Sequence, residues 1–315
     1  MRIIFCGTPE FAVPSFRRLL SDSFFSVAAV ITQPDRPRGR GHNVSASPVK
    51  EVALAAGAHV YQPENIKSDS AFDFFQRLAP DAVVIIAYGQ IIPQRLIAIP
   101  RLGWINLHAS LLPKYRGAAP IAWAIVNGET TTGLTTMQID AGMDTGPILL
   151  QQKIEIGPDD AAPELTRRMS EAGAQLVVDT LRKLDRAEIK PQPQDASQAS
   201  LAPRLKKEHG LIDWSAAAQD IYNRIRGLAP WPGAYTTFRG KTCHIWGRPQ
   251  DSAHAPSAEP LGSIVVSGET AHVICGESTQ LQLEGVQMEG RKRITAREFV
   301  NGTHLTSGER FGATG

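Results

Sequence analysis

The sequence is poor in cysteine and has no long apolar run. Its 315 residues include three cysteines, Cys6, Cys243 and Cys275, which lie far apart and form no CxxC pair. This spacing argues against a zinc site and against a disulfide framework. No stretch approaches the roughly twenty apolar residues of a membrane-spanning helix, and the first residues contain no signal-peptide core. We therefore expect a cytoplasmic protein that binds no metal and does not associate with membranes.

An excess of charge of one sign is also lacking. Lys and Arg number 33 against 31 Asp and Glu, so the net charge is only +2. A nucleic-acid partner would therefore have to bind local basic clusters. Each cluster alone is also typical of a solvated surface loop, but three separated clusters would suit a large polyanion. The clusters are Arg36, Arg38 and Arg40; Arg204, Lys206 and Lys207; and Arg291, Lys292 and Arg293.

The glycine pattern of a dinucleotide site is missing as well. The first apolar run ends in "CGTPEF", which has one glycine, and Pro9 stands where the backbone would have to approach a pyrophosphate. GxGxxG is not present. A nicotinamide-dependent oxidoreductase is correspondingly disfavoured.

What the sequence does contain is an alternation of short apolar runs and helical segments. The runs "RIIFCGT", "SVAAVITQ", "DAVVIIAYG" and "WINLH" are typical of buried strands, and amphipathic stretches lie between them. Such alternation predicts an α/β fold, a doubly wound and mostly parallel sheet, over residues 1–187. Ligands of these sheets bind at the carboxyl ends of the strands.

The composition changes after this region. Residues 188–210 are rich in Pro, Gln, Ser and Ala without periodicity, which predicts a linker with a basic end. Residues 211–315 offer one helical segment and then many short strand-like segments separated by Gly and polar turns. We expect a smaller C-terminal domain built as an OB-like β-barrel.

The candidate catalytic residues follow the strand "WINLH". Asn106 and His108 share one face, because side chains alternate along a strand. A carboxamide can stabilise an oxyanion, and a histidine can act as acid or base near neutral pH. A carboxylate would complement His108, and Asp144 is the natural partner, although Asp140 competes with it and the sequence does not rank the two. Each of these residues also has an ordinary structural alternative, as a turn or a strand-end cap.

Several motifs, taken together, resemble a known family. They match in order and spacing those of the methionyl-tRNA formyltransferase family, within the wider superfamily that uses 10-formyltetrahydrofolate. The similarity spans nearly the whole chain. The motifs are "FCGTPEFAVPS", "TQPDRPRGRG", "NLHASLLPKYRGAAPI", "GLTTMQIDAGMDTGPIL", "LAPRLKKEHGLIDW" and "IRGLAPWPGAY".

The resemblance implies transfer of a formyl group from 10-formyltetrahydrofolate to the α-amine of methionyl initiator tRNA. It makes Asn106, His108 and Asp144 the catalytic group, with no metal and no covalent protein intermediate, in a formyltransferase Rossmann-like domain. We expect a monomer. The implied folate-binding residues are Ser110, Leu111, Leu112, Pro113, Ile86, Tyr88 and Gly89. The residues expected to contact tRNA are Arg36, Arg38, Arg40, Lys206, Lys207, Arg291 and Arg293.

Other functions remain open from the sequence. A formyltransferase acting on a small amine, such as an amino sugar nucleotide, would share the catalytic group but would not need the basic clusters. A hydrolase could release formate from the same folate. A non-catalytic OB-type RNA-binding protein would use the basic clusters and leave Asn106, His108 and Asp144 without a role.

Overall fold

The computed structural model describes residues 1–38, 43–250, 259–305 and 308–312. The chain divides into two compact units. Unit 1 comprises residues 1–120, 131–155 and 164–203, and unit 2 comprises residues 121–130, 156–163 and 204–315. Of the segment expected to be a linker, residues 188–203 therefore lie in unit 1 and residues 204–210 in unit 2.

Unit 1 is built on a seven-stranded sheet of order β10-β9-β7-β6-β1-β2-β5. Strands β5, β2, β1, β6 and β7 run parallel, whereas β9 is antiparallel to β7 and β10 to β9. The strands are β1 (Arg2–Gly7), β2 (Ser26–Ile31), β5 (Val60–Tyr61), β6 (Ala82–Ile86), β7 (Trp104–His108), β9 (Thr131–Gln138) and β10 (Ile148–Glu155).

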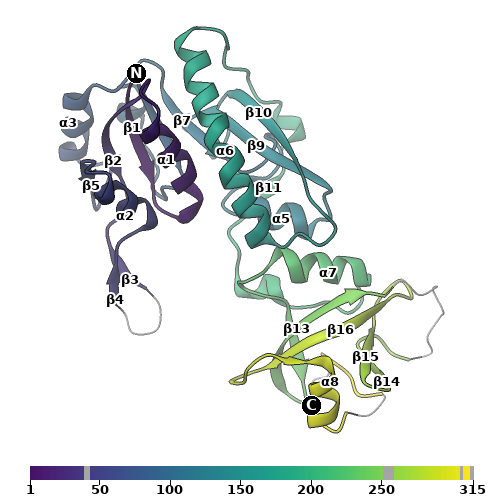
Figure 1. The fold of residues 1–315 in the computed structure, drawn as a ribbon. Helices are drawn as coiled ribbons and strands as arrows, with labels where there is room; N and C mark the ends of the chain where they lie inside the picture. Colours follow the sequence, from purple (N-terminus) through teal and green to yellow (C-terminus); the bar gives the residue numbers. More distant parts are fainter. Residues whose placement is uncertain (39–42, 251–258, 306–307, 313–315) are drawn as a thin grey trace. The chain divides into compact units, whose positions relative to one another are not determined.

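Helices cover both faces of this sheet, as Figure 1 shows. Phe5 of β1 stacks on Phe16 of α1, while its neighbour Cys6 points to the other face and joins the cluster that contains Phe75 of α3. This arrangement confirms the predicted doubly wound, mostly parallel sheet. The helices of unit 1 are α1 (Val13–Ser21), α2 (Pro48–Ala55), α3 (Asp69–Leu78), α4 (Gln94–Ile97) and the long α6 (Ala162–Asp185), which begins in unit 2.

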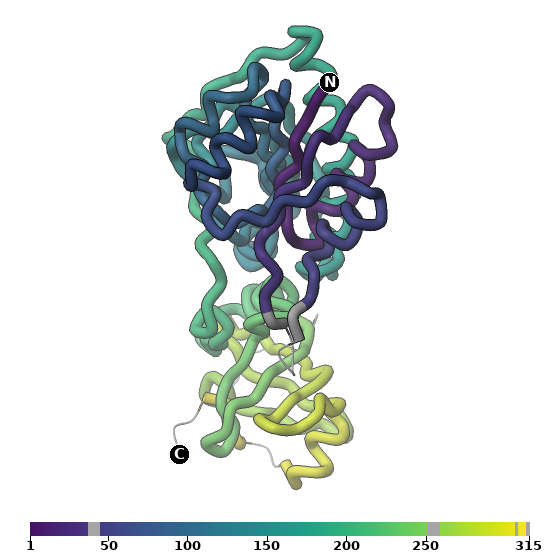
Figure 2. The backbone as a smooth tube through the Cα atoms, turned by 90° about the vertical axis from the view of Figure 1, so that its left-hand side faces the viewer, coloured from purple at the N-terminus to yellow at the C-terminus, as the bar shows by residue number. Residues whose placement is uncertain are grey.

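Two short pairings of unit 1 lie outside the main sheet. A hairpin of β3 (Arg36–Arg38) and β4 (Asn43–Ser45) joins β2 to α2, and Figures 1 and 2 show it leaving the sheet. β8 (Arg116–Gly117) pairs in parallel with β11 (Leu201–Ala202), so the chain just before unit 2 returns to the loop that follows β7. Short 3-10 turns lie at Glu10–Ala12 and Ala196–Gln198.

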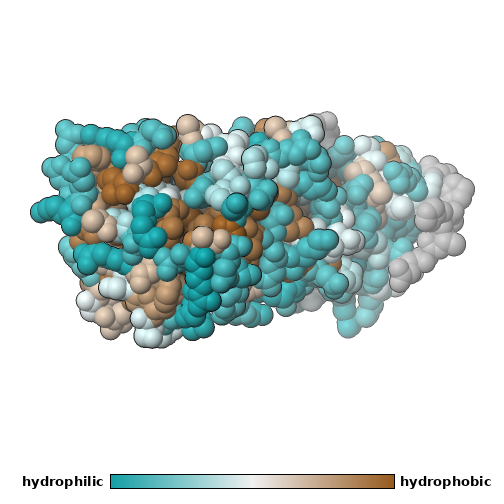
Figure 3. All heavy atoms as spheres, turned by 90° about the horizontal axis from the view of Figure 1, so that it is seen from above, coloured by the Kyte–Doolittle hydropathy of each residue, from teal (hydrophilic) through white to brown (hydrophobic). Residues whose placement is uncertain are grey.

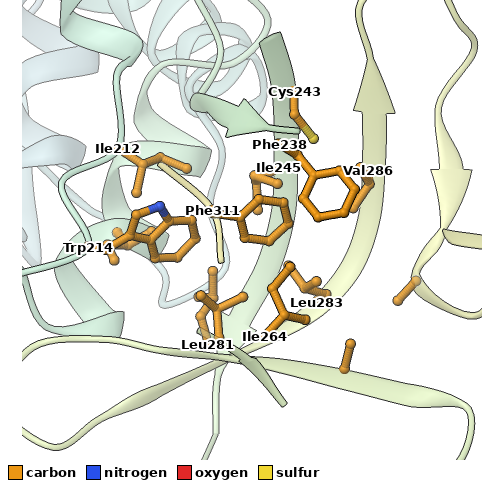
Figure 4. Close-up of a cluster of buried hydrophobic side chains, with 14 of the residues drawn as sticks. Ile212, Trp214, Phe238, Cys243, Ile245, Ile264, Leu281, Leu283, Val286 and Phe311 are labelled. Carbon is orange, nitrogen blue, oxygen red and sulfur yellow. The ribbon is translucent and has the colours of Figure 1, made fainter. Parts of the chain in front are cut away.

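Unit 2 has its own apolar core. Figure 4 shows Trp214, Phe238 and Phe311 gathered with aliphatic residues from the strands, and the indole of Trp214 stacks on Phe311. The strand order is β12-β13-β16-β15-β14, with β17 on β16, and all pairings are antiparallel. That this sheet closes as an OB-like barrel stays a prediction.

The elements of unit 2 come mostly from the end of the chain. They are α5 (Pro120–Val126), a 3-10 turn (Lys207–Gly210), α7 (Ala218–Gly227), β12 (Tyr235–Phe238), β13 (Lys241–Pro249), β14 (Ile264–Ser267), β15 (Thr270–Ile274), β16 (Gln280–Met288), β17 (Ile294–Thr295) and α8 (Ala296–Gly302).

The surface is mixed in polarity. On the face drawn in Figure 3, hydrophilic residues surround separate hydrophobic patches. Within the described parts of the chain, no helix combines the length and the apolar character needed to cross a bilayer.

Candidate active site

Asn106 and His108 lie at the carboxyl end of β7, in the interior of the sheet of unit 1. Strand alternation places both on the face that also carries Trp104, whereas Leu107 points to the other face and contacts α6 at Gly173. His108 is buried and Asn106 is half-buried. Among the described residues, no other group hydrogen-bonds the carboxamide of Asn106. Its N–H groups are therefore available to a bound molecule.

The orientation of His108 is fixed by a backbone carbonyl. Its Nε2 lies 2.9 Å from the carbonyl oxygen of Tyr115. Because a carbonyl oxygen only accepts hydrogen bonds, Nε2 must carry a proton. The nitrogen left for proton transfer or for hydrogen bonding to a substrate is Nδ1.

Asp144 is the carboxylate beside that nitrogen. Its Oδ2 lies 3.7 Å from His108 Nδ1, which is within the distance of an ion pair but longer than a hydrogen bond. The same oxygen accepts a 2.8 Å hydrogen bond from the backbone N–H of Gly117. Asp140 is exposed and binds Gly142 N and Thr145 Oγ1 within its own turn. The geometry thus favours Asp144 over Asp140 as the partner of His108.

The loop after His108 is tied to β9 and β10. Thr135 Oγ1 donates to the Ser110 carbonyl at 2.7 Å and accepts from Leu112 N at 3.1 Å and from Gln151 Nε2 at 3.0 Å. Gln151 also donates to the Leu112 carbonyl at 2.8 Å. The Ser110 hydroxyl is itself used inside the loop, where it donates to the Lys114 carbonyl at 2.6 Å. These contacts brace the predicted folate-binding loop from below.

The other predicted folate-binding residues take varied positions. Leu112 is buried, and Leu111 packs over Gly133 of β9. Pro113 is half-buried. Ile86 ends β6 and is fully buried.

Tyr88 and Gly89 follow β6. The ring of Tyr88 belongs to the apolar core on the α3 side of the sheet, and burial raises the pKa of its hydroxyl. Its carbonyl accepts from Gln33 Nε2 at 3.0 Å and from Thr8 Oγ1 at 3.4 Å. Gly89 has a φ of +91°, a conformation that favours glycine. The Tyr88 ring is therefore not available to a ligand, and this segment could contact one only through its backbone.

Sequence reasoning missed the polar residues that hold the site together. Thr135 had a weak signal, since its neighbours in the strand are mostly apolar or threonine. Gln151 had less, because Gln152 and Lys153 follow it in the same strand. Gln194 and Ser200 had none, because they lie in the segment that looked like a linker. Gln194 contacts both Arg116 and the Asp144 loop, and Ser200 accepts from Tyr115 N at 2.9 Å.

The predicted basic residues belong to both units. In unit 1, Arg36 is exposed on the hairpin and Arg38 ends β3, while Arg40 lies outside the described residues. In unit 2, Lys206 and Lys207 are exposed, and so are Arg291 and Arg293. The guanidinium of Arg293 lies 4.2 Å from the centre of the Trp246 ring. Within the described ranges, no three His, Cys, Asp or Glu side chains gather where they could bind a metal ion.

A doubly wound sheet with a free carboxamide, an oriented histidine and a carboxylate at one strand end defines a protein suited to acyl transfer. Comparison with known proteins narrows this class. A family model described as formyl transferase matches residues 1–181, and one described as formyl transferase, C-terminal domain, matches residues 204–304. The chain belongs to the formyl transferase family.

Relatives agree with this assignment, and a solved structure shares the fold. A methionyl-tRNA formyltransferase of Solibacter usitatus is 54% identical, and the match covers 99% of each chain. One of Koribacter versatilis is 50% identical, again over 99% of each. The crystal structure of an N-formyltransferase from Helicobacter canadensis, in complex with folinic acid and dTDP-3-aminofucose, has a TM-score of 0.65 at 17% identity, covering 91% of this chain and 98% of that one. That last likeness concerns the fold alone.

Proposed function

We propose that this enzyme transfers the formyl group of 10-formyltetrahydrofolate to the α-amino group of methionine esterified to initiator tRNA. The observation that carries the proposal is the full-length similarity, at about half identical residues, to relatives named methionyl-tRNA formyltransferase. A folate-type formyl donor agrees with membership of the formyl transferase family. The free carboxamide of Asn106 and the oriented His108 provide groups suited to such a transfer.

In the mechanism we propose, the amine nitrogen attacks the formyl carbon, and negative charge develops on the formyl oxygen. The Asn106 amide and a protonated His108, through Nδ1–H, donate hydrogen bonds to that oxygen. The bond from the formyl carbon to the donor nitrogen then breaks, and a proton passes from the amine to that nitrogen through His108 or an ordered water. Asp144 stabilises the positive charge on the imidazole.

The acceptor is expected to bind through charge as well. The exposed Arg36, with Arg38 and Arg40, would contact the phosphate backbone. Lys206, Lys207, Arg291 and Arg293 would add contacts from unit 2. Because such contacts release counterions, the KM for tRNA should rise steeply with salt concentration, whereas a small amine acceptor would show little dependence.

The direct test is transfer of labelled formyl from 10-formyltetrahydrofolate, with methionylated initiator tRNA, the same tRNA uncharged and free methionine as parallel acceptors. We expect label only on the charged tRNA. Release of formate without an acceptor, or labelling of a small amine instead, would contradict the proposal. Binding of tRNA without any transfer would favour a non-catalytic RNA-binding protein.

A further inference from the structure

Gln194 joins the loop that bears Asp144 to the loop whose Tyr115 carbonyl holds His108. It is half-buried and lies outside any helix or strand, between α6 and β11. Its Nε2 donates to the carbonyl oxygens of Asp144, at 2.9 Å, and Gly146, at 2.7 Å. Its Oε1 accepts from Nη2 of Arg116 at 2.7 Å and from Nε at 3.1 Å. Both amide hydrogens and the amide oxygen are therefore engaged.

The two loops that it joins control opposite sides of the imidazole. Arg116 directly follows Tyr115, whose carbonyl holds His108 Nε2. Asp144 lies beside His108 Nδ1. Movement of either loop would change the relation between the histidine and its carboxylate. The backbone of Asp144 itself has a φ of +53°, an uncommon conformation for a residue other than glycine.

Ser200 acts on the same loop from the same segment. Its hydroxyl accepts from Tyr115 N at 2.9 Å, and its carbonyl accepts from Arg116 N at 2.8 Å. The pairing of β11 with β8 follows immediately. The segment thus binds the backbone of the Tyr115 loop through Ser200 and the Arg116 side chain through Gln194.

We propose that Gln194 is a positioning residue for formyl transfer, holding Asp144 and the Tyr115 carbonyl in register with His108, with Ser200 as its auxiliary. This inference rests on the proposed function. It adds to the active site a segment, residues 194–200, that touches no reacting group. Gln194 touches none of the reacting atoms and acts only through its two loops. Its loss should therefore lower kcat more than it changes substrate binding.

The test compares Gln194→Ala with Gln198→Ala. Gln198 lies in the same segment, is exposed, and bonds through its side chain only to Asp195 among the described residues. We expect Gln194→Ala to lower kcat by about 10- to 100-fold, with each KM within about threefold of wild type, because small misplacements of catalytic groups cost this much. Gln198→Ala should match the wild type. A Gln194→Ala kcat within about threefold of wild type, or an equal loss in both variants, would overturn the inference.

A second pair of variants separates positioning from mere filling of space. Gln194→Glu keeps the size and the acceptor for Arg116 but cannot donate to the two carbonyl oxygens, so it should be no more active than Gln194→Ala. Wild-type kcat in Gln194→Glu would contradict the inference.

Should Gln194→Ala fail to fold, Ser200→Ala takes its place. Its kcat should fall, and Ser200→Thr should restore the kcat. No fall in Ser200→Ala would refute the role of this segment.

A spectroscopic measurement keeps the inference distinct from the proposed function. The imidazole 15N shifts of His108, assigned with His108→Asn, should report a protonated Nε2 in the wild type. They should change in Gln194→Ala and not in Gln198→Ala, whatever the acceptor of the reaction is. Unchanged shifts would refute positioning even if formyl transfer is shown, and an inactive wild-type protein with changed shifts would refute only the proposed function.

Discussion

At the scale of residues, one group orients the His108 ring and a different group supplies the negative charge beside it. A backbone carbonyl, from Tyr115, fixes which nitrogen carries the proton, and the Asp144 carboxylate lies too far from Nδ1 for a hydrogen bond. A substitution of Asp144 that keeps an oxygen to accept from Gly117 N should leave the orientation by the carbonyl in place. The two contributions can therefore be measured separately.

The first prediction concerns Asn106. Asn106→Ala removes a proposed oxyanion donor and should lower kcat about 100- to 1,000-fold, as the loss of such donors does elsewhere. The variant should fold and bind tRNA normally. The control is Asn301→Ala, an exposed change in α8. Steady-state formyl transfer decides the matter, and near-normal kcat would remove Asn106 from the mechanism.

The second prediction separates the two aspartates. Asp144→Asn keeps an oxygen that can accept from Gly117 N but loses the negative charge, so kcat should fall about tenfold or more, within the usual reach of acid–base effects. Asp140→Asn alters only a surface turn and should keep kcat within about twofold. The reverse ranking in formyl-transfer assays would assign the charge to Asp140.

The sequence made some of these residues predictable and hid others. Asn106 and His108 could be found because the two-residue period of a strand and the polarity of a sheet's carboxyl edge are local rules. The partner of His108 could be narrowed only to Asp140 or Asp144, since the choice depends on which carboxylate is bound within its own turn. Gln194 could not be found, because its importance comes from contacts with loops distant in the sequence. Tyr88 lies where expected, but its ring packs into the core, a direction that an apolar run does not fix.

At the scale of elements, the short pairing of β8 with β11 depends on a glycine. Gly117 has a φ of +124°, and a Cβ there would lie 2.6 Å from the Ala202 carbonyl oxygen. A side chain would force β8 and β11 apart and displace the N–H that binds Asp144.

Gly117→Ala should therefore lower both stability, by roughly 1–3 kcal/mol, and kcat. Gly302→Ala, at the end of α8, is the control, because an added carbon there would lie within 4 Å of no described atom beyond its chain neighbours and the backbone of its own helix. Thermal unfolding and formyl-transfer kinetics measure the two effects. Unchanged kcat in Gly117→Ala would show that the β8–β11 pairing does not support the site.

The strands of unit 2 carry two histidines whose pKa values are lowered. Burial lowers the pKa of His272 on β15 and of His244 on β13, and the charge of Lys207 lowers the latter further. In the unfolded chain the pKa of histidine is about 6.5, so between about pH 7 and pH 5 the unfolded state takes up protons more readily. Their stabilising effect is complete above that pKa and is lost as pH falls.

We therefore expect the free energy of unfolding of unit 2 to decrease from about pH 7 to pH 5. Replacing both histidines, His244→Gln with His272→Gln, should make this decrease smaller. Urea denaturation at several pH values, followed by amide hydrogen exchange in β13, β15 and β16 of unit 2, provides the measurement. An unchanged slope in the double variant would exclude these histidines as its source.

At the scale of the whole molecule, the thiols report on the two cores. All three cysteines are buried, Cys6 in unit 1 and Cys243 and Cys275 in unit 2. Burial raises the pKa of Cys6, and it raises the pKa of Cys243 and of Cys275 to about 12. Because the thiolate is the reactive form, none should react quickly in the folded protein.

A thiol reagent at pH 8 should thus label no cysteine rapidly in the native state and all three in guanidinium chloride. Mass spectrometry of partly labelled protein should show Cys243 and Cys275 reacting together, because they share a core, and Cys6 at a rate of its own. Rapid labelling of native Cys6 would contradict the burial on which this prediction depends. Equal rates at all three positions would mean that both cores open in one step.

The chain path of unit 2 has a consequence for protein engineering. Residues 121–130 and 156–163 leave unit 1 in mid-sequence and belong with the C-terminal part. Within unit 2, Tyr222 donates to Asp159 at 2.7 Å, and Arg226 donates to the carbonyls of Gly157 and Asp160. No single cut therefore yields two complete pieces. A truncation after residue 187 removes Gln194 and Ser200. A truncation after residue 203 leaves residues 121–130 and 156–163 without the rest of unit 2. Chimaeras between family members should therefore be most stable when the three stretches of unit 2 are exchanged together.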